Sequence, residues 1–251
     1  MEIKIEHLKI DNLFIDFNLK IKEKSFTTII GSSSCGKTTL AKLLCGYIQN
    51  ECVTTEKKEN ISILFDQIED NFIYDTVIEN LVFPLENRNI DKSEMKKRVT
   101  QIANYLNINA LLECNVHTLS GGEKELVALA EALITNPKLL VLDEAFGMLD
   151  EMQKQKCFKL LKKINREKKT TIIYLTSDVE NVVYGKEIAI LANKKIIKQG
   201  PVKEILTDEK SFKIANQKLP FMADLSLKLK YYNLIDGLIL EESKMVDTLW
   251  K

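Results

Sequence analysis

Three short segments contain residues that could carry out phosphate chemistry. They are Gly31–Thr38 (GSSSCGKT), Leu119–Glu123 (LSGGE) and Leu139–Glu144 (LLVLDE). Glycines in the first segment let backbone N–H groups turn toward phosphate oxygens. The third segment is an apolar run that ends in two carboxylates, which suit Mg²⁺ and an attacking water molecule. Together the segments predict a site that binds and hydrolyses a nucleotide.

The first segment predicts a phosphate-binding loop, because an apolar strand at 26–30 precedes it and a helical pattern follows it. A chance glycine–lysine turn, the alternative, would not explain both neighbours. Lys37 is expected to reach the β- and γ-phosphates, and Thr38 to hold Mg²⁺ through its hydroxyl. Cys35 is expected to be a small filler, with a redox role as the alternative. The predicted nucleotide-binding residues are Gly31, Ser32, Ser33, Ser34, Cys35, Gly36, Lys37, Thr38 and Thr39.

The carboxylates at the end of the third segment have separate expected roles. Asp143 closes a buried strand, where it can complete the coordination of Mg²⁺. Glu144 follows and is expected to polarise the attacking water. The alternative is a pair of acids that only cap a helix.

The second segment is expected to begin a helix whose apolar stripe runs from Leu126 to Leu133. Free N–H groups and a serine hydroxyl at that point make an anion site, whereas the simpler alternative is a serine N-cap. The residues concerned are Ser120, Gly121, Gly122 and Glu123.

Composition limits the remaining classes of function. Lysine plus arginine equals aspartate plus glutamate at 36 each, so no basic excess indicates nucleic acid as a partner. No apolar run approaches the ~20 residues of a membrane span, and the N-terminus lacks the apolar block of a signal peptide. The five cysteines lack metal-site spacing and predict free thiols in a reducing cytosol.

The pattern along the chain predicts an α/β fold with a mostly parallel sheet. Strands are expected at 3–10, 13–21, 26–30, 61–65, 138–142 and 170–175, a helix at 151–167, and a hairpin at 186–198 that turns at Asn193. A helical subdomain at about 73–135 interrupts the sheet. Gly200-Pro201 is expected to break the chain. The predicted units are residues 1–205 and a helical tail at 206–251.

The order and spacing of the three segments resemble the ATP-binding subunits of ABC transporters. Within that family the chain is most similar to the ATPases of energy-coupling factor (ECF) transporters, which import vitamins and transition-metal ions in prokaryotes. The stretches that carry this resemblance are Asp75–Phe83 with Leu85–Asn87, Gly147–Asp150, and Leu219–Phe221 through Leu225–Leu229. The resemblance implies a P-loop fold with antiparallel N-terminal strands.

The same resemblance implies how the chain would work. Two such subunits would close head to tail, with each ATP and its Mg²⁺ held between one phosphate loop and the partner's LSGG segment. Asp150 would be the D-loop aspartate at that seam, and the tail is a candidate dimer contact. Residues around 66–90 would receive a membrane-embedded transport subunit, which works with a substrate-capture membrane protein. The subunit would then lie peripherally on the cytoplasmic face of the membrane.

Several residues depart from the family pattern. Ser177 stands where the switch histidine is expected, and it cannot supply that positive charge, so hydrolysis at the site with Lys37 and Glu144 should be slow. Asp66 aligns with the Mg²⁺-binding glutamine and Gln67 comes one place late, which leaves both as candidates. Glu123 replaces a glutamine.

A further departure concerns the aromatic residue that stacks on adenine. Asn12 occupies its position, and Phe14, on the polar face of its strand, is either a substitute or a partly exposed strand aromatic.

These departures favour a heterodimer with a second ATPase, because an asymmetric pair tolerates one weaker site. Two alternatives stay open. One is a nucleotide-binding regulatory subunit with little catalysis, and the other is a non-transport ABC ATPase that acts on DNA or ribosomes.

Overall fold

The computed structural model describes residues 2–55, 60–66 and 72–250. The strands are β1 (Ile3–Ile10), β2 (Phe14–Ile21), β3 (Phe26–Ile30), β4 (Val53–Thr54), β5 (Ile61–Leu64), β6 (Leu139–Asp143), β7 (Thr171–Thr176), β8 (Glu187–Ala192) and β9 (Lys195–Pro201). The α-helices are α1 (Lys37–Leu44), α2 (Val77–Glu86), α3 (Lys92–Leu106), α4 (Gly121–Ile134), α5 (Glu151–Glu167), α6 (Val202–Ile205), α7 (Glu209–Ile214), α8 (Phe221–Tyr231) and α9 (Glu242–Leu249). Short 3₁₀ helices are η3 (Asn109–Leu111), η4 (Val116–Thr118) and η5 (Val179–Tyr184).

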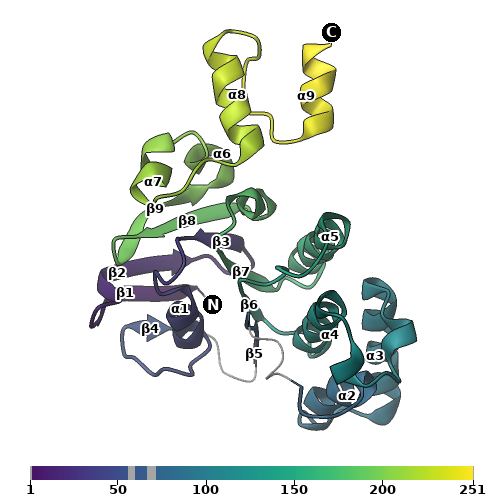
Figure 1. Ribbon diagram of the computed structural model, residues 1–251. Coiled ribbons are helices and arrows are strands. Elements are labelled where there is room, and N and C mark those ends of the chain that lie inside the picture. The colour runs from purple at the N-terminus through teal and green to yellow at the C-terminus, as the bar shows by residue number, and fades with distance from the viewer. Residues whose placement is uncertain (1, 56–59, 67–71, 251) are drawn as a thin grey trace.

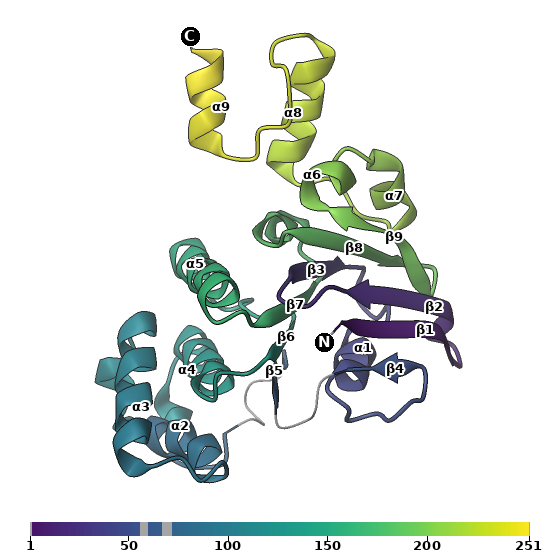
Figure 2. The same cartoon turned by 180° about the vertical axis from the view of Figure 1, so that it is seen from behind.

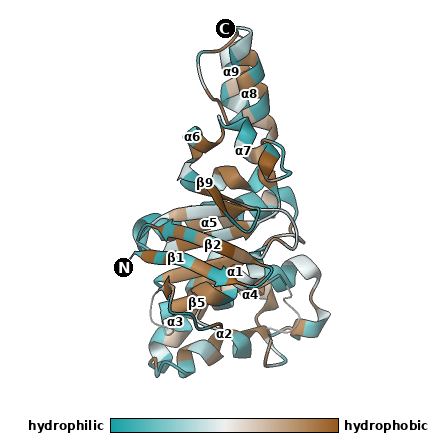
Figure 3. Cartoon of the chain, turned by 90° about the vertical axis from the view of Figure 1, so that its left-hand side faces the viewer, coloured by the Kyte–Doolittle hydropathy of each residue, from teal (hydrophilic) through white to brown (hydrophobic). Residues whose placement is uncertain are grey.

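The strands form two sheets, as Figure 1 shows. The larger has the order β5-β6-β7-β3-β8-β9 and is parallel except for the β8–β9 pair. The smaller, β2-β1-β4, is antiparallel. In Figure 3, hydrophobic and hydrophilic stretches alternate along β1 and β2, as expected for a sheet with one buried face. The predicted α/β fold with antiparallel N-terminal strands is confirmed.

The central parallel strands are buried on both faces, which explains their continuous apolar sequences. Every residue of β3, β6 and β7 is buried. Along β6, Leu140 and Leu142 belong to a core cluster shared with α2–α5, whereas Leu139 and Val141 belong to a cluster shared with α1 and the small sheet. Because β3 lies between β7 and β8, the loop that follows Ile30 is fixed beside the carboxyl end of β7.

The helices of the 73–135 region follow one another between β5 and β6 in chain order. Figures 1 and 2 show α2, α3 and α4 gathered on the side of the large sheet away from β1 and β2. The tail helices α6 and α7 pack near β8 and β9, and α8 and α9 lie at one extremity of the molecule. No helix in the described ranges combines the length and apolarity needed to cross a membrane.

The sequence predicts the turn of the β8–β9 hairpin correctly, but β9 extends to Pro201, beyond the predicted end of the hairpin at residue 198. Asn193 and Lys194 both have positive φ, 50° and 66°, which is the backbone of a two-residue hairpin turn. Gly200-Pro201, however, does not break the strand. The two residues pair with Ile188 and Glu187, and an edge strand tolerates the missing proline N–H.

Candidate functional site

The loop between β3 and α1 carries Gly31–Thr39 and fixes Lys37 at the first position of α1. The Lys37 ammonium donates hydrogen bonds of 2.8 Å to the carbonyl oxygens of Gly31 and Ser32, and the residue is only 5% exposed. Gly36 precedes it at φ 105°, a conformation that favours glycine. The loop therefore holds its cation in a defined position.

Glu144 lies directly against that cation. Its Oε1 is 3.0 Å from Lys37 Nζ, and its Oε2 accepts a 2.9 Å hydrogen bond from the backbone N–H of Ser177. The parallel pairing of β6 with β7 and of β7 with β3 brings these three residues together, since all follow the carboxyl ends of their strands. Glu144 has φ 51°, a strained value of the kind that clusters at functional sites.

Asp143 has the chemistry of a metal ligand. The residue is 1% exposed, and neither carboxylate oxygen has a hydrogen-bond partner by distance and angle among the described residues. Burial raises its pKa, while the nearby Thr38 hydroxyl acts in the opposite direction. A buried carboxylate without a cation is costly, so Asp143 and Thr38 fit an Mg²⁺ ion.

A cavity of about 370 Å³ lies beside Glu144 and Ser177, in the size range of small-molecule sites. Ser33, Asp66, Glu144 and Ser177 are among the residues that line it. Asp66 is exposed, and its charge contributes to the raised pKa of Asp143. Gln67, the other candidate for the Mg²⁺-binding position, lies outside the described residues.

Phe14 has a different place from the one predicted. Its side chain is 1% exposed and packs on Phe17 with ring centroids 4.6 Å apart, so it is neither a partly exposed aromatic nor free to stack on a base. The register of β1 and β2 shifts between the pairs Leu8–Phe17 and Ile10–Phe14, and Asp16 has φ 49°. This bulge puts Phe14 and Phe17 on the same face.

Phe14 also supports the phosphate loop. A Cβ placed on Gly36 would lie 3.1 Å from Cζ of Phe14, so the ring closes the space behind the glycine. Cys35 plays a similar packing part, because a Cβ on Gly31 would lie 2.6 Å from its Sγ. Burial raises the pKa of the Cys35 thiol, which agrees with its expected role as a filler.

Ser120 caps α4 through a capping box. Its hydroxyl donates to Glu123 Oε2 at 2.7 Å, its backbone N–H donates to the same oxygen at 2.8 Å, and it accepts from Glu123 N–H at 3.4 Å. Glu123 therefore turns back on the serine. An anion that reaches Ser120 would compete with this carboxylate.

The Ser120 end of α4 lies beside Met148 and Leu149 rather than beside Lys37. A Cβ on Gly121 would be 2.4 Å from Met148 Sδ, and Asp150 caps α5 by accepting from Gln153 N–H at 2.7 Å. In both Figure 1 and Figure 2, α4 stands apart from α1, across the strands of the large sheet. The Gly31–Thr38 loop and the LSGGE segment of one chain thus lie in separate regions of the molecule.

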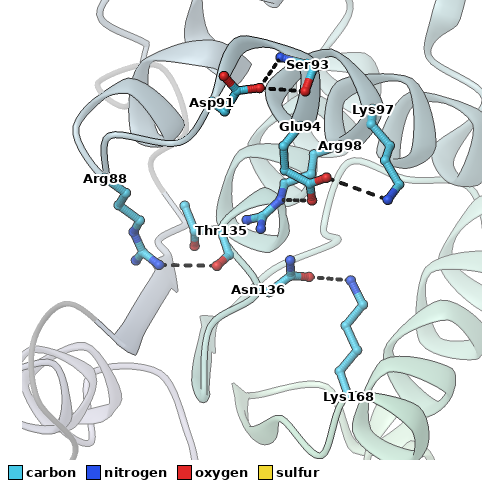
Figure 4. Close-up of polar contacts among 9 residues, drawn as sticks. All are labelled: Arg88, Asp91, Ser93, Glu94, Lys97, Arg98, Thr135, Asn136 and Lys168. Atoms are coloured by element: carbon cyan, nitrogen blue, oxygen red, sulfur yellow. Dashed lines mark hydrogen bonds and ion pairs between the residues drawn. The ribbon is translucent and has the colours of Figure 1, made fainter.

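Two carboxyl groups on α4, the buried Glu125 and the half-buried Glu131, are missing from the predicted site. A groove of about 410 Å³ between β5 and the ends of α2 and α4 includes Glu131 in its lining. Beside it, Arg88 Nη1 donates a 3.2 Å hydrogen bond to the Thr135 carbonyl, which Figure 4 shows. Burial raises the pKa of Glu131 to about 7. Glu125 shares a helical stripe with Leu129, and that pattern could have identified it as buried.

Glu131 should make stability depend on pH. Its pKa is higher in the folded chain, about 7, than its ordinary 4.5, so the contribution of Glu131 to stability is most favourable below pH 4.5 and becomes less favourable as pH rises to 7. Above pH 7 the ionised Glu131 lowers the free energy of unfolding by roughly 2–3 kcal/mol. Glu131→Gln should therefore raise the free energy of unfolding at pH 8 and change it little at pH 4.5. Denaturant titrations at both pH values measure this, with the exposed Glu51→Gln as control. An equal effect at both pH values would contradict the prediction.

The fold and the site define a protein of the P-loop class, in which a buried lysine lies beside an acidic pair at the carboxyl ends of parallel strands. The sequence matches the ABC transporter family over residues 14–147, more than half of the chain. The chain therefore belongs to the ABC transporter family, as an ATP-binding domain.

Curated relatives and a solved structure agree with this membership. An energy-coupling factor transporter ATP-binding protein, EcfA1 of Mycoplasma mobile, is 31% identical over 86% of this chain and 83% of its own length. A putative ABC transporter ATP-binding protein of Clostridium acetobutylicum is 33% identical over 86% and 82%. The structure of cbiO1 from Clostridium perfringens, part of the ABC transporter complex cbiONQ, has a TM-score of 0.74 at 27% identity and covers 89% of this chain and 97% of its own.

Proposed function

We propose that the chain is the ATP-binding and ATP-hydrolysing subunit of an ECF-type importer of vitamins or transition-metal ions. The observation that carries the proposal is the meeting of Lys37, Asp143, Glu144 and Ser177 at the carboxyl ends of β3, β6 and β7. The names of the curated relatives and of cbiO1 support the transporter type. The substrate would be captured by a separate membrane protein.

The residues of the site take separate parts in this proposal. Thr38 and Asp143 would hold Mg²⁺, which supplies positive charge to the phosphates when bound. Lys37 would exchange its ion pair with Glu144 for the phosphates. That exchange frees the Glu144 carboxylate to orient a water molecule and take its proton. The backbone N–H of Ser177 keeps the freed carboxylate in place.

The active form would be a dimer with a second ATPase, in which Ser120–Glu123 and Asp150 act on the partner's ATP. The separation of α4 from α1 within one chain supports this division. The tail would add a dimer contact, supported by exposed aromatics. Phe221, Tyr231, Tyr232 and Trp250 are 63%, 81%, 70% and 85% exposed.

The groove beside Glu131 would receive the membrane-embedded subunit and so place the chain peripherally on the cytoplasmic face of the membrane. Residues 84–88 of the expected docking region contribute Pro84, Asn87 and Arg88 to its lining. Co-purification from native membranes tests the whole proposal. A second ATPase and a membrane scaffold should accompany the chain, whereas its recovery as a lone stable homodimer would contradict it.

The site of this chain would be the weaker one of the pair, because Ser177 lacks an imidazole. Ser177→His should raise the turnover of the assembled complex roughly tenfold, or about 1.4 kcal/mol, since a charged contact stabilises the transition state. Ser177→Ala should change turnover less than about twofold, because the contact to Glu144 comes from the backbone. Steady-state ATPase rates measure both. A Ser177→His variant no faster than wild type would show that the serine is not limiting.

A further inference from the structure

Glu125 is a buried carboxylate that the proposed mechanism does not use. It lies in the second turn of α4, is 3% exposed, and has no cation within ion-pair distance in the described part of the chain. Its Oε2 accepts a 3.1 Å hydrogen bond from the backbone N–H of Met148. Burial raises its pKa, and the backbone N–H groups of residues 146–149 lower it. The carboxylate therefore binds the Met148 amide and lies near the other backbone amides of residues 146–149.

Those amides belong to the segment that joins Glu144 to Asp150. The segment is also held from its other side, where Tyr174 Oη donates to the Ala145 carbonyl at 3.2 Å and the buried Phe146 ring packs edge-on against Phe158. Phe146 has φ 76°, which costs energy in a residue with a side chain. The conformation thus needs external support.

Glu125 supplies that support from α4, the helix that begins at the LSGGE segment. It lies five residues after Ser120, and Met148, whose N–H it binds, covers Gly121. Burial raises the pKa of Cys157 on α5 and the charge of Glu125 adds to that rise, so Glu125 lies near α5 as well as near the Ala145–Leu149 segment. A buried acceptor that satisfies a backbone donor is costly to remove, because a donor left without a partner costs about 1–3 kcal/mol.

We propose that Glu125 is a positioning residue for ATP hydrolysis, which holds the Ala145–Leu149 segment against α4 and thereby fixes Glu144 and Asp150 at its two ends. The inference rests on the proposed function, because it assigns the consequence to the catalytic step. The requirement is for acceptor oxygens and not for charge. Glutamine should therefore replace Glu125, whereas methionine, of similar length but without a comparable acceptor, should not.

The test compares Glu125→Gln and Glu125→Met in the complex with the partner ATPase. Glu125→Met should lower kcat about tenfold or more while KM for ATP stays within about twofold. Glu125→Gln should keep kcat within about threefold of wild type. Amide hydrogen exchange of the nucleotide-free subunit should show lost protection at 146–149 only in the methionine variant, with β6 and β7 unchanged.

Each other outcome has a definite meaning. Wild-type exchange at 146–149 in Glu125→Met, or lost protection with unchanged kcat, would overturn the inference. Equal losses in both variants with matching falls in melting temperature would overturn it too, since they would indicate a general structural role. A wild-type complex that does not hydrolyse ATP would instead defeat the proposed function, and exchange would still decide whether Glu125 holds the segment.

Discussion

Lys37→Ala should lower the affinity of the subunit for ATP by about 100-fold, or roughly 2.7 kcal/mol. The ammonium is buried and held by two carbonyl oxygens and by Glu144, so the loop positions it before any phosphate arrives. A preorganised cation contributes more than a flexible one because little ordering remains to be done on binding. Calorimetric titration of the nucleotide-free subunit with ATP measures the loss.

The matched control is Lys42→Ala. Lys42 lies in the last turn of the same helix but is exposed, and it should leave ATP affinity unchanged within about twofold. Glu144 keeps its hydrogen bond to Ser177 N–H when Lys37 is removed, so the fold should persist. Affinity close to wild type in a folded Lys37→Ala variant would show that the loop does not bind the phosphates.

Glu144→Gln should reduce ATP turnover at this chain's site by about 100-fold or more and leave ATP binding nearly unchanged. The amide can still accept from Ser177 N–H, but it cannot take a proton from water, and general bases contribute typically 10²–10⁴-fold. Single-turnover hydrolysis in the assembled complex, with the partner subunit unaltered, isolates this site.

Glu167→Gln, at the exposed end of α5, is the control for a lost carboxylate. It should not change the rate. If Glu144→Gln also left turnover and uptake unchanged, the chain would be a regulatory subunit that binds nucleotide with little catalysis.

Much of the fold follows from local patterns. The predicted helix at 151–167 matches α5, because Asp150 caps it and its apolar stripe is regular. The continuous apolar runs at 138–142 and 170–175 indicated strands covered on both faces. Lys37, Glu144 and Ser177, which were predicted to belong to one site, each follow a strand of this kind, and the structure brings them together.

Other features depend on contacts that local patterns do not reveal. A strict alternation of buried and exposed residues along β2 places Phe14 on the wrong face, because one extra residue in β2 shifts the alternation. The sequence around Asp16 gives no distinctive signal for this bulge. The raised pKa of Glu131 arises from packing across the groove between β5 and α4. Likewise, the place of Met148 over Gly121 results from the path of a loop.

The position of β3 determines when the nucleotide loop can form during synthesis. Its two neighbours in the sheet are β7 and β8, at Thr171–Thr176 and Glu187–Ala192, although β3 itself ends at Ile30. A nascent chain shorter than about 190 residues therefore has a phosphate-loop strand with at least one open edge, and such edges invite wrong pairing. Most of the chain must therefore be synthesised before both edges of β3, and with them the strand that leads into the earliest motif, are paired.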